Sequence, residues 1–262
     1  MPCLKADFHL HSCLSPCGSL AMSPSVIVKT LKERGVQIAA LTDHNSALNC
    51  PAFAHHCKKE GIFALFGMEA QTSEEIHVLC LFSALETALA FSEEIYAILP
   101  SFINNPEKTG DQVFVDEDDN IIGEVEKYLV ISADIGIDDL ATRVHQLGGL
   151  VIPAHIDRSS FSLTSQLGFV PHGDWDALEV VRTPPSCVEW IDGKQLFVEL
   201  DTRGFPMTTS SDAHYPEHIA RRPFDLDFAD APLHGVGGIL NDDDSVNIET
   251  LKAALQRRPR AF

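Results

Sequence analysis

The feature that most constrains this chain is a series of short apolar runs separated by amphipathic segments. The segment that follows Ser23 has the period of a helix, with Pro24 at its first position, apolar Ile27 and Leu31 on one face, and Gly35 as its end. Short strands that alternate with helices are typical of βα units around a parallel sheet or barrel. We therefore predict an α/β fold. The apolar runs are IAAL (38–41), FALF (63–66), HVLCLF (77–82), LVIP (150–153), ALEVV (177–181) and PMTTSS (206–211).

One segment, at about 83–132, breaks this alternation. Its sequence predicts a helix, then a loop, and then a hairpin that turns at DEDDN (116–120). We interpret it as an insertion, because 262 residues are an ordinary length for one α/β barrel domain. The prediction is a single domain over residues 1–262.

The charge of the chain bears on its partners. With 19 basic and 38 acidic residues, the formal net charge is −19. Such a charge repels a phosphate backbone at long range, and the sequence has no basic stripe with interleaved aromatic residues. We therefore expect no long duplex nucleic acid as a partner. A small phosphorylated substrate is compatible with the charge, because bound divalent cations would dominate the potential inside a cleft.

The cysteines and the hydropathy indicate in which cellular compartment the protein is expected. The seven cysteines are odd in number and scattered through the chain, which favours reduced thiols. The start of the sequence lacks the features of a secretory signal, and no stretch approaches the roughly 18 apolar residues that a membrane span needs. We expect a cytoplasmic protein without a membrane partner.

Histidines and acids gather where the predicted strands end. His9 and His11 lie two residues apart, so on a strand they share one face and can chelate one ion. Taken alone, this pair is a weak signal, but other polar residues follow the later runs. Barrels of βα units place their active sites at the carboxyl ends of their strands. His77 lies instead at the start of its run, so its inclusion depends less on this argument. The residues at strand ends are Asp43, His44, Glu69, His155, Asp212 and His214.

Five motifs in order carry a family resemblance: DFHLHS, TDHN, GMEA with a following EIHVL, PAHID, and SSDAH. Over about residues 7–218 the chain resembles the PHP (polymerase and histidinol phosphatase) phosphoesterases. The resemblance implies a distorted (β/α)7 barrel and two or three divalent ions, which are Zn, Mn or Fe. The ligands that it implies are His9, His11, His44, Glu69, His77, His155, Asp212 and His214.

Cys17 marks a departure from the family pattern. Many members carry a His or Asp shortly after the first motif, whereas this chain has Pro16 and Cys17 there. A thiolate is a good ligand for Zn or Fe and a poor one for Mn. Either Cys17 is a further ligand that favours a softer metal, or it is a loop cysteine held by packing.

Three further roles can be assigned near these motifs. Arginine binds pairs of phosphate oxygens well, and Arg158 is our first candidate, followed by Arg221 and Arg222. Asp43 stands beside His44 and is expected to orient an imidazole. Glu69 is the best candidate for a carboxylate that bridges two ions.

These observations predict a metal-dependent phosphoesterase in which metal-activated hydroxide attacks a small phosphorylated substrate. The arrangement of motifs resembles most the nucleotide phosphatase and oligoribonuclease branch, so a nucleotide or short oligonucleotide is favoured and histidinol phosphate stays open. Two alternatives remain: an amidohydrolase-like metal hydrolase, which also begins with an HxH pair, and a metal-binding module without catalysis.

Overall fold

The structure is a computed structural model that describes residues 3–191 and 194–258. The helices are α1 (Pro24–Glu33), α2 (Cys50–Glu60), α3 (Leu85–Ile98), α4 (Pro106–Thr109), α5 (Ile137–Gln146), α6 (Leu163–Leu167), α7 (Ile248–Gln256) and the 3-10 turn η1 (Pro216–His218). The strands are β1 (Cys3–Asp7), β2 (Ile38–Leu41), β3 (Phe63–Gln71), β4 (His77–Phe82), β5 (Val113–Val115), β6 (Ile121–Glu124), β7 (Leu150–Pro153), β8 (Leu178–Glu179), β9 (Ser186–Ile191), β10 (Lys194–Glu199), β11 (Met207–Thr208) and β12 (Phe224–Asp227).

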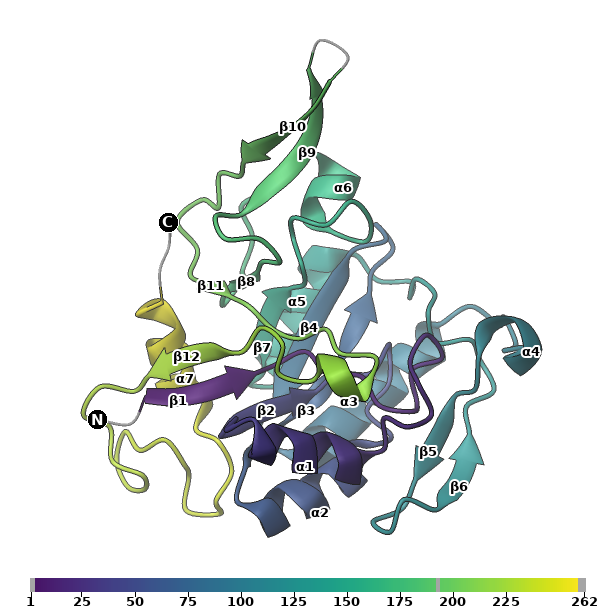
Figure 1. Ribbon diagram of the computed structural model, residues 1–262, viewed down its shortest axis with the longest axis vertical. Coiled ribbons are helices and arrows are strands. Elements are labelled where there is room, and N and C mark those ends of the chain that lie inside the picture. The colour runs from purple at the N-terminus through teal and green to yellow at the C-terminus, as the bar shows by residue number, and fades with distance from the viewer. Residues whose placement is uncertain (1–2, 192–193, 259–262) are drawn as a thin grey trace.

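The largest sheet has six strands in the order β12-β1-β2-β3-β4-β7 (Figure 1). Strands β1, β2 and β3 are parallel, as the βα pattern predicts. Strand β12 pairs with β1, β4 with β3, and β7 with β4, all in the antiparallel direction. The sheet is therefore mixed, and the expectation of a purely parallel sheet holds for only part of it.

Hydrogen bonds beyond this sheet curl the structure around the site. The amide of Asp176 donates to the carbonyl of Val151 at 2.9 Å, which ties the start of β8 to β7. Strand β8 pairs in parallel with β11. The amide of His11 then donates to the carbonyl of Ala213 at 3.0 Å, so the segment after β11 lies beside the segment after β1. The fold is a mixed α/β fold with a curled sheet. The distorted (β/α)7 barrel and the single-domain assignment stay predictions.

The short connection between β3 and β4 explains why the alternation fails there. Only residues 72–76 join the two strands, and a link of this length makes an antiparallel pair, because a parallel pair needs a longer crossover. Gln71 at the end of β3 consequently pairs with His77 at the start of β4. The first residue of β4 thus lies at the same edge as the carboxyl ends of the parallel strands.

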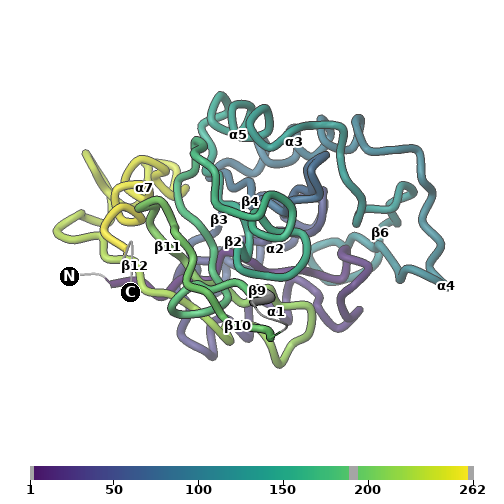
Figure 2. The backbone as a smooth tube through the Cα atoms, turned by 90° about the horizontal axis from the view of Figure 1, so that it is seen from above, coloured from purple at the N-terminus to yellow at the C-terminus, as the bar shows by residue number. Residues whose placement is uncertain are grey.

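Two apolar clusters hold the elements together. One contains Ile27 of α1, Phe53 of α2 and Phe91 of α3, and the other contains Leu79 of β4 and Leu251 of α7. Helices α1 and α2 pack against each other below the sheet in Figure 1. Figure 2 shows α7 at one end of the molecule and the segment with α4 and β6 at the other.

The helix predicted after Ser23 is confirmed as α1. The hairpin predicted to turn at 116–120 is confirmed as β5 and β6. The β9–β10 hairpin was not predicted. Within residues 3–191 and 194–258, no helix is long and apolar enough to cross a membrane.

Candidate metal centre

The histidines and acids singled out in the sequence meet at one edge of the curled sheet. His9 and His11 follow β1, His44 follows β2, and Glu69 lies near the end of β3. His155 follows β7, and Asp212 and His214 follow β11. His77, at the start of antiparallel β4, joins them. All are buried except His214, which is half-buried.

Glu69 lies at the middle of this group. Its Oε1 is 2.8 Å from His77 Nδ1 and 2.9 Å from His155 Nε2. The same oxygen is 3.2 Å from His9 Nε2. The other oxygen, Oε2, is 3.1 Å from His44 Nδ1 and 3.4 Å from His11 Nε2. One carboxylate therefore faces five imidazoles, which suits a residue that bridges two cations.

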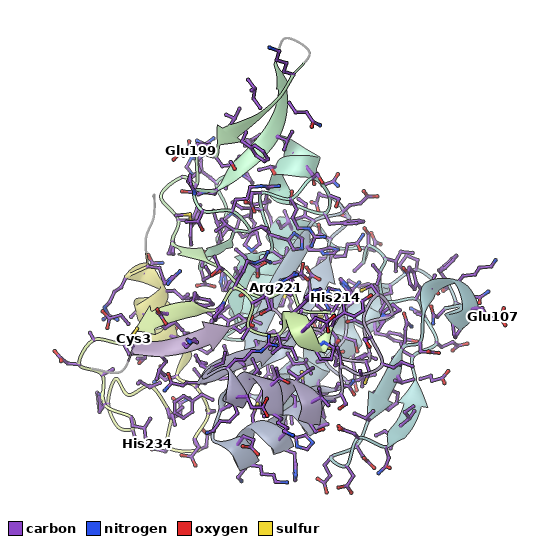
Figure 3. The ribbon with its side chains drawn as sticks, viewed as in Figure 1. Cys3, Glu107, Glu199, His214, Arg221 and His234 are labelled. Carbon is purple, nitrogen blue, oxygen red and sulfur yellow. The ribbon has the colours of Figure 1, made fainter. Side chains whose placement is uncertain are left out.

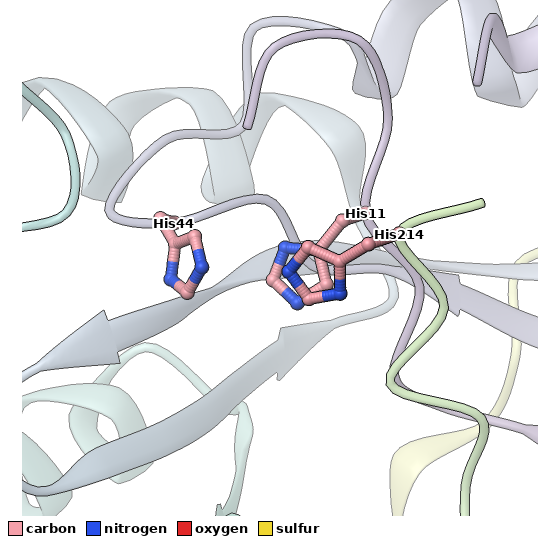
Figure 4. A group of neighbouring side chains, drawn as sticks. All are labelled: His11, His44 and His214. Carbon is pink, nitrogen blue, oxygen red and sulfur yellow. The ribbon is translucent and has the colours of Figure 1, made fainter. Parts of the chain in front are cut away.

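All the donors except His155 fall into three groups, and within each group the ligand atoms lie within 4.8 Å of one another. Figure 4 shows one of them, with the ring of His214 over that of His11 and the ring of His44 beside them. His11 belongs to two groups, as does His44, so the three possible ion positions adjoin. The groups are His9, His11 and Asp212; His44, Glu69 and His77; and His11, His44 and His214.

Two carboxylates outside these groups fix the orientation of the imidazoles. The oxygens of Glu179, at the end of β8, accept from His9 Nδ1 at 3.0 and 3.1 Å. Asp43 accepts from the Ser15 hydroxyl at 2.7 Å, and the Ser15 oxygen in turn lies 3.0 Å from His11 Nδ1. Each contact leaves the Nε2 atom to face the site. Asp43 thus acts on His11 through Ser15, and not directly on its neighbour His44.

The loop that carries Asp212 is held by three charged side chains. Asp7 accepts from the Ser211 amide at 2.9 Å. Arg221 Nε donates to the Ser211 carbonyl at 2.6 Å, and Arg222 Nε donates to the carbonyl of Ser210 at 3.0 Å. These contacts favour a positioning role for both arginines over contact with a substrate.

Burial and mutual charge set the protonation of the donors. Burial alone would raise the pKa of Glu69, but His77, His9 and His44 hold that pKa well below its usual range. Burial lowers the pKa of His44 well below its ordinary value, and burial with the charge of His11 lowers the pKa of His214 to about 3. Near neutral pH, Glu69 is ionised and these two imidazoles are neutral. Those are the forms that bind metal ions. Burial alone would lower the pKa of His9, but the charges of Glu179 and Glu69 raise that pKa well above its ordinary value, so His9 must lose a proton before it binds an ion.

The ring nitrogens that face the site fit divalent cations. His9 Nε2 and His11 Nε2 lie 3.0 Å apart, and their Nδ1 atoms already face Glu179 and Ser15. Two bare ring nitrogens at this distance repel each other unless a proton or a cation lies close by. The buried Nδ1 of His155 has no hydrogen-bond partner among the described residues. A set of imidazoles and carboxylates is the donor chemistry of Zn, Mn and Fe.

Four of the ten described non-glycine residues with a positive φ angle lie at this site. Asn45, His155, Phe161 and Asp212 have φ angles of 48°, 32°, 54° and 47°. This is a conformation that non-glycine residues rarely adopt, and strain of this kind gathers at functional sites. Phe161 also stacks its ring on that of His77, with centroids 4.9 Å apart.

Two predicted residues lie at the border of the site. Arg158 is half-buried, and its Nη1 donates to Asp212 Oδ2 at 2.7 Å. Cys17 is exposed and belongs to none of the three donor groups that the described residues form. Its role, as a ligand or as a loop cysteine, stays a prediction.

Comparisons with known proteins agree with this geometry. The sequence matches the PHP domain family over residues 7–179, which is more than half of the chain. The chain belongs to the PHP domain family. Asp212 and His214 lie beyond the matched residues, and the fold brings them close to the other donors.

Solved structures with a similar fold cover nearly all of this PHP-family chain. The lesion-specific endonuclease EndoQ from Pyrococcus furiosus is 16% identical, with a TM-score of 0.59, over 97% of this chain and 56% of its own. A complex of Endonuclease Q with a 27-mer duplex that carries an abasic lesion at the active site is 17% identical, with a TM-score of 0.58, over 97% of this chain and 57% of its own. A structure from Bifidobacterium adolescentis, assigned as a metal-dependent phosphoesterase, is 15% identical, with a TM-score of 0.52, over 98% of both chains.

Curated relatives match a short stretch of the chain. The PolC-type DNA polymerase III of Streptococcus pyogenes is 34% identical over 71 residues, and that of Streptococcus agalactiae is 35% identical over the same length. The match covers 27% of this chain and 5% of either polymerase. The chain thus spans about a twentieth of these relatives and little more than half of EndoQ.

The exclusion of long duplex nucleic acid was wrong. Endonuclease Q, which has a similar fold, is bound to a 27-mer duplex. The argument failed because net charge is a sum over the whole surface, whereas the potential at a binding face depends on the charges and cations near that face.

Sequence reasoning missed Glu179 and gave no role to Asp7. Glu179 is buried inside the predicted strand ALEVV, and an ionisable side chain within an apolar run was a signal of a paired carboxylate. Asp7 precedes the HxH pair and shares its polar alternation. Its partner, Ser211, is 204 residues away, so the sequence could not identify it.

Proposed function

We propose that this PHP-family chain is a metal-dependent phosphoesterase that hydrolyses phosphate esters of nucleotides or of nucleic acid strands. The observation that carries the proposal is the buried carboxylate of Glu69 with five imidazoles around it. Burying so many polar groups is costly unless they bind one another or a cation. A set of donors from six separate segments is therefore best explained by bound ions.

The three donor groups would hold the ions. Glu69 belongs to one of these groups and also faces His9 and His11 of the other two. Divalent ions there would activate a water molecule and neutralise the charge that develops on a phosphoryl group. The residues of the chain supply position: Glu179 and Ser15 orient His9 and His11, and buried surroundings exclude bulk water.

Arg158 is the side chain best placed to bind the substrate. It contacts Asp212 through Nη1, and 41% of its side chain is exposed. A guanidinium has five N–H groups, so Arg158 can keep this contact and still offer donors to two oxygens of a phosphate.

The relatives favour a phosphodiester or phosphomonoester of nucleic acid over histidinol phosphate. One structural relative is an endonuclease, and the curated relatives are DNA polymerases. Histidinol phosphate stays a candidate, because the centre itself recognises a phosphoryl group and not the group attached to it.

The test is a hydrolysis screen on protein that has been stripped of metal and reloaded with Zn, Mn or Fe. The substrates are nucleoside monophosphates and bisphosphates, single strands and duplexes of DNA and RNA, duplex DNA with an abasic site, and histidinol phosphate, with amides and lactones alongside. Glu69→Gln is the matched control, because it keeps the shape of the side chain and removes its charge. We expect ester hydrolysis that depends on metal and is lost in Glu69→Gln.

Two results would overturn the proposal. Cleavage of amides or lactones without any phosphate ester would make the chain an amidohydrolase-like enzyme. Full metal loading without any hydrolysis would favour the metal-binding module.

A further inference from the structure

The β9–β10 hairpin rises beyond the curled sheet (Figure 1). It carries an exposed aromatic side chain. Phe197 of β10 is 68% exposed, the largest fraction of any phenylalanine that the structure describes. Val188 of β9 pairs directly with Phe197 and is 40% exposed, so the two side chains share one face of the hairpin. Leu196, next in the chain, is 45% exposed and points to the opposite face.

A continuous set of contacts joins this face to the metal centre. The guanidinium of Arg182 lies over the ring of Phe197, with its central carbon 5.3 Å from the ring centroid. The Arg182 amide donates to Asp157 Oδ2 at 2.7 Å, and its guanidinium donates to the Asp157 carbonyl. Asp157 is followed by Arg158, which contacts the centre through Asp212. Figure 3 places His214 near the middle of the molecule and Glu199, at the base of the hairpin, above it.

Along this set of contacts, the side chains change from charged arginines near the metal centre to an aromatic ring on the hairpin. The arginines at 158 and 182 are partly exposed, with exposed side-chain fractions of 41% and 36%, in a chain whose net charge is −19. Glu199 lies two residues from Phe197 on the same face of the hairpin and would repel a phosphate there. A phosphate therefore fits at the arginines, and a neutral ring fits on Phe197. Along this set of contacts, both arginines lie between the metal centre and the ring of Phe197. A ligand that contacts both the centre and the ring must therefore be extended.

We propose that Arg158, Arg182 and Phe197 form a binding surface for a strand of nucleic acid, with phosphates at the arginines and a base stacked on Phe197. Every base has a face that stacks on an aromatic ring, so the surface binds strands with little sequence preference. The inference rests on the proposed phosphoesterase function. It adds that a substrate strand must be long enough to reach Phe197 in order to gain the stacking contact. A substrate of one nucleotide uses the centre and Arg158, and a longer strand also gains the contact with Phe197.

Kinetics on a series of oligothymidylates of increasing length tests this requirement. Phe197→Ala should leave kcat/KM for p-nitrophenyl phosphate and for a mononucleotide within twofold of wild type. For the longest strand it should lower kcat/KM by roughly 5- to 100-fold, which corresponds to one lost stacking contact. Phe197→Trp should restore the rate. Leu196→Ala is the matched control, since it removes a neighbouring exposed side chain from the opposite face and should have no effect. Equal rates for Phe197→Ala and wild type at every length would refute the proposal, as would an equal loss in Leu196→Ala.

A binding assay separates failure of this inference from failure of the proposed function. Fluorescence anisotropy with a labelled oligothymidylate and with a labelled duplex, both in EDTA, measures affinity without turnover. We expect weaker binding by Phe197→Ala than by wild type for the single strand. If wild type hydrolyses no phosphate ester but this difference is present, the proposed function fails and the binding surface stands. If only the duplex, or neither ligand, distinguishes the two proteins, the single-strand surface is wrong.

Discussion

Replacing Glu179 tests how much of the metal affinity depends on a residue that is not itself among the donors. Both oxygens of Glu179 contact His9 Nδ1, and Oε1 also accepts from the His155 amide at 3.2 Å. Loss of a partner of this kind typically lowers metal affinity or activity by about 10- to 100-fold. Glu179→Gln keeps an oxygen acceptor and loses the charge, so we expect a loss of about tenfold, or ~1.4 kcal/mol. Glu179→Ala loses every contact and leaves the amide of His155 unpaired, so we expect about 100-fold, or ~2.7 kcal/mol.

The assay is competition for Zn²⁺ against a chromophoric chelator at fixed pH, with metal content measured after dialysis. Glu199→Gln makes the same chemical change on the exposed β9–β10 hairpin and should leave the affinity unchanged. Thermal melting of the metal-free proteins establishes that each variant folds. Wild-type affinity in a folded Glu179→Ala variant would falsify the claim that this carboxylate orients His9.

Four further outcomes are expected. His9→Ala should abolish hydrolysis and lower the bound metal, as measured by elemental analysis; unchanged stoichiometry with full activity would remove the site assignment. Arg158→Ala should lower kcat/KM for phosphate esters by about ten- to a hundredfold with metal content unchanged, and wild-type kinetics would make it an ordinary surface residue. Cys17→Ser should leave the order of Zn, Fe and Mn affinities as it is, because the side chain is exposed and outside the donor groups; a selective loss of Zn would restore it as a ligand. Gly67→Ala should destabilise the fold by about 1–3 kcal/mol in urea unfolding, since a Cβ there would collide with the Cys80 carbonyl of β4, and an unchanged midpoint would contradict this.

The sequence predicted the donors well because each follows a local pattern. His44 and His155 come directly after short apolar runs, and strands that run in parallel place the residues after them at one edge. The same pattern gave only weak support for His77. Its place at the edge depends on the reversed direction of β4, which follows from the short link after β3 and not from the periodicity of the run.

Residues that orient the donors were harder to predict, because they depend on long-range pairing. Ser15 connects Asp43 to His11, and nothing in the sequence distinguishes Asp43 as a partner of His11 from Asp43 as a partner of the adjacent His44. The β9–β10 hairpin was missed although Asp192 and Gly193 stand between two apolar runs, which is a typical signal of a hairpin.

The closure of the curled sheet also determines at which stage of folding the complete metal centre forms. The donors extend from His9 to His214, and the last two are brought to the others by the contact of Ala213 with the segment after β1, by the pairing of β11 with β8 and by the contact of Asp7 with Ser211. A chain in which β11 has not joined β8 therefore lacks two of the three donor groups, so the full set of ions binds only the closed fold. Binding of this kind adds its free energy to the stability of the whole fold, by about 4 kcal/mol when free metal exceeds the dissociation constant a thousandfold. Removal of the ions by a chelator would then lower the free energy of unfolding of the whole fold, and not the stability of any one strand by itself.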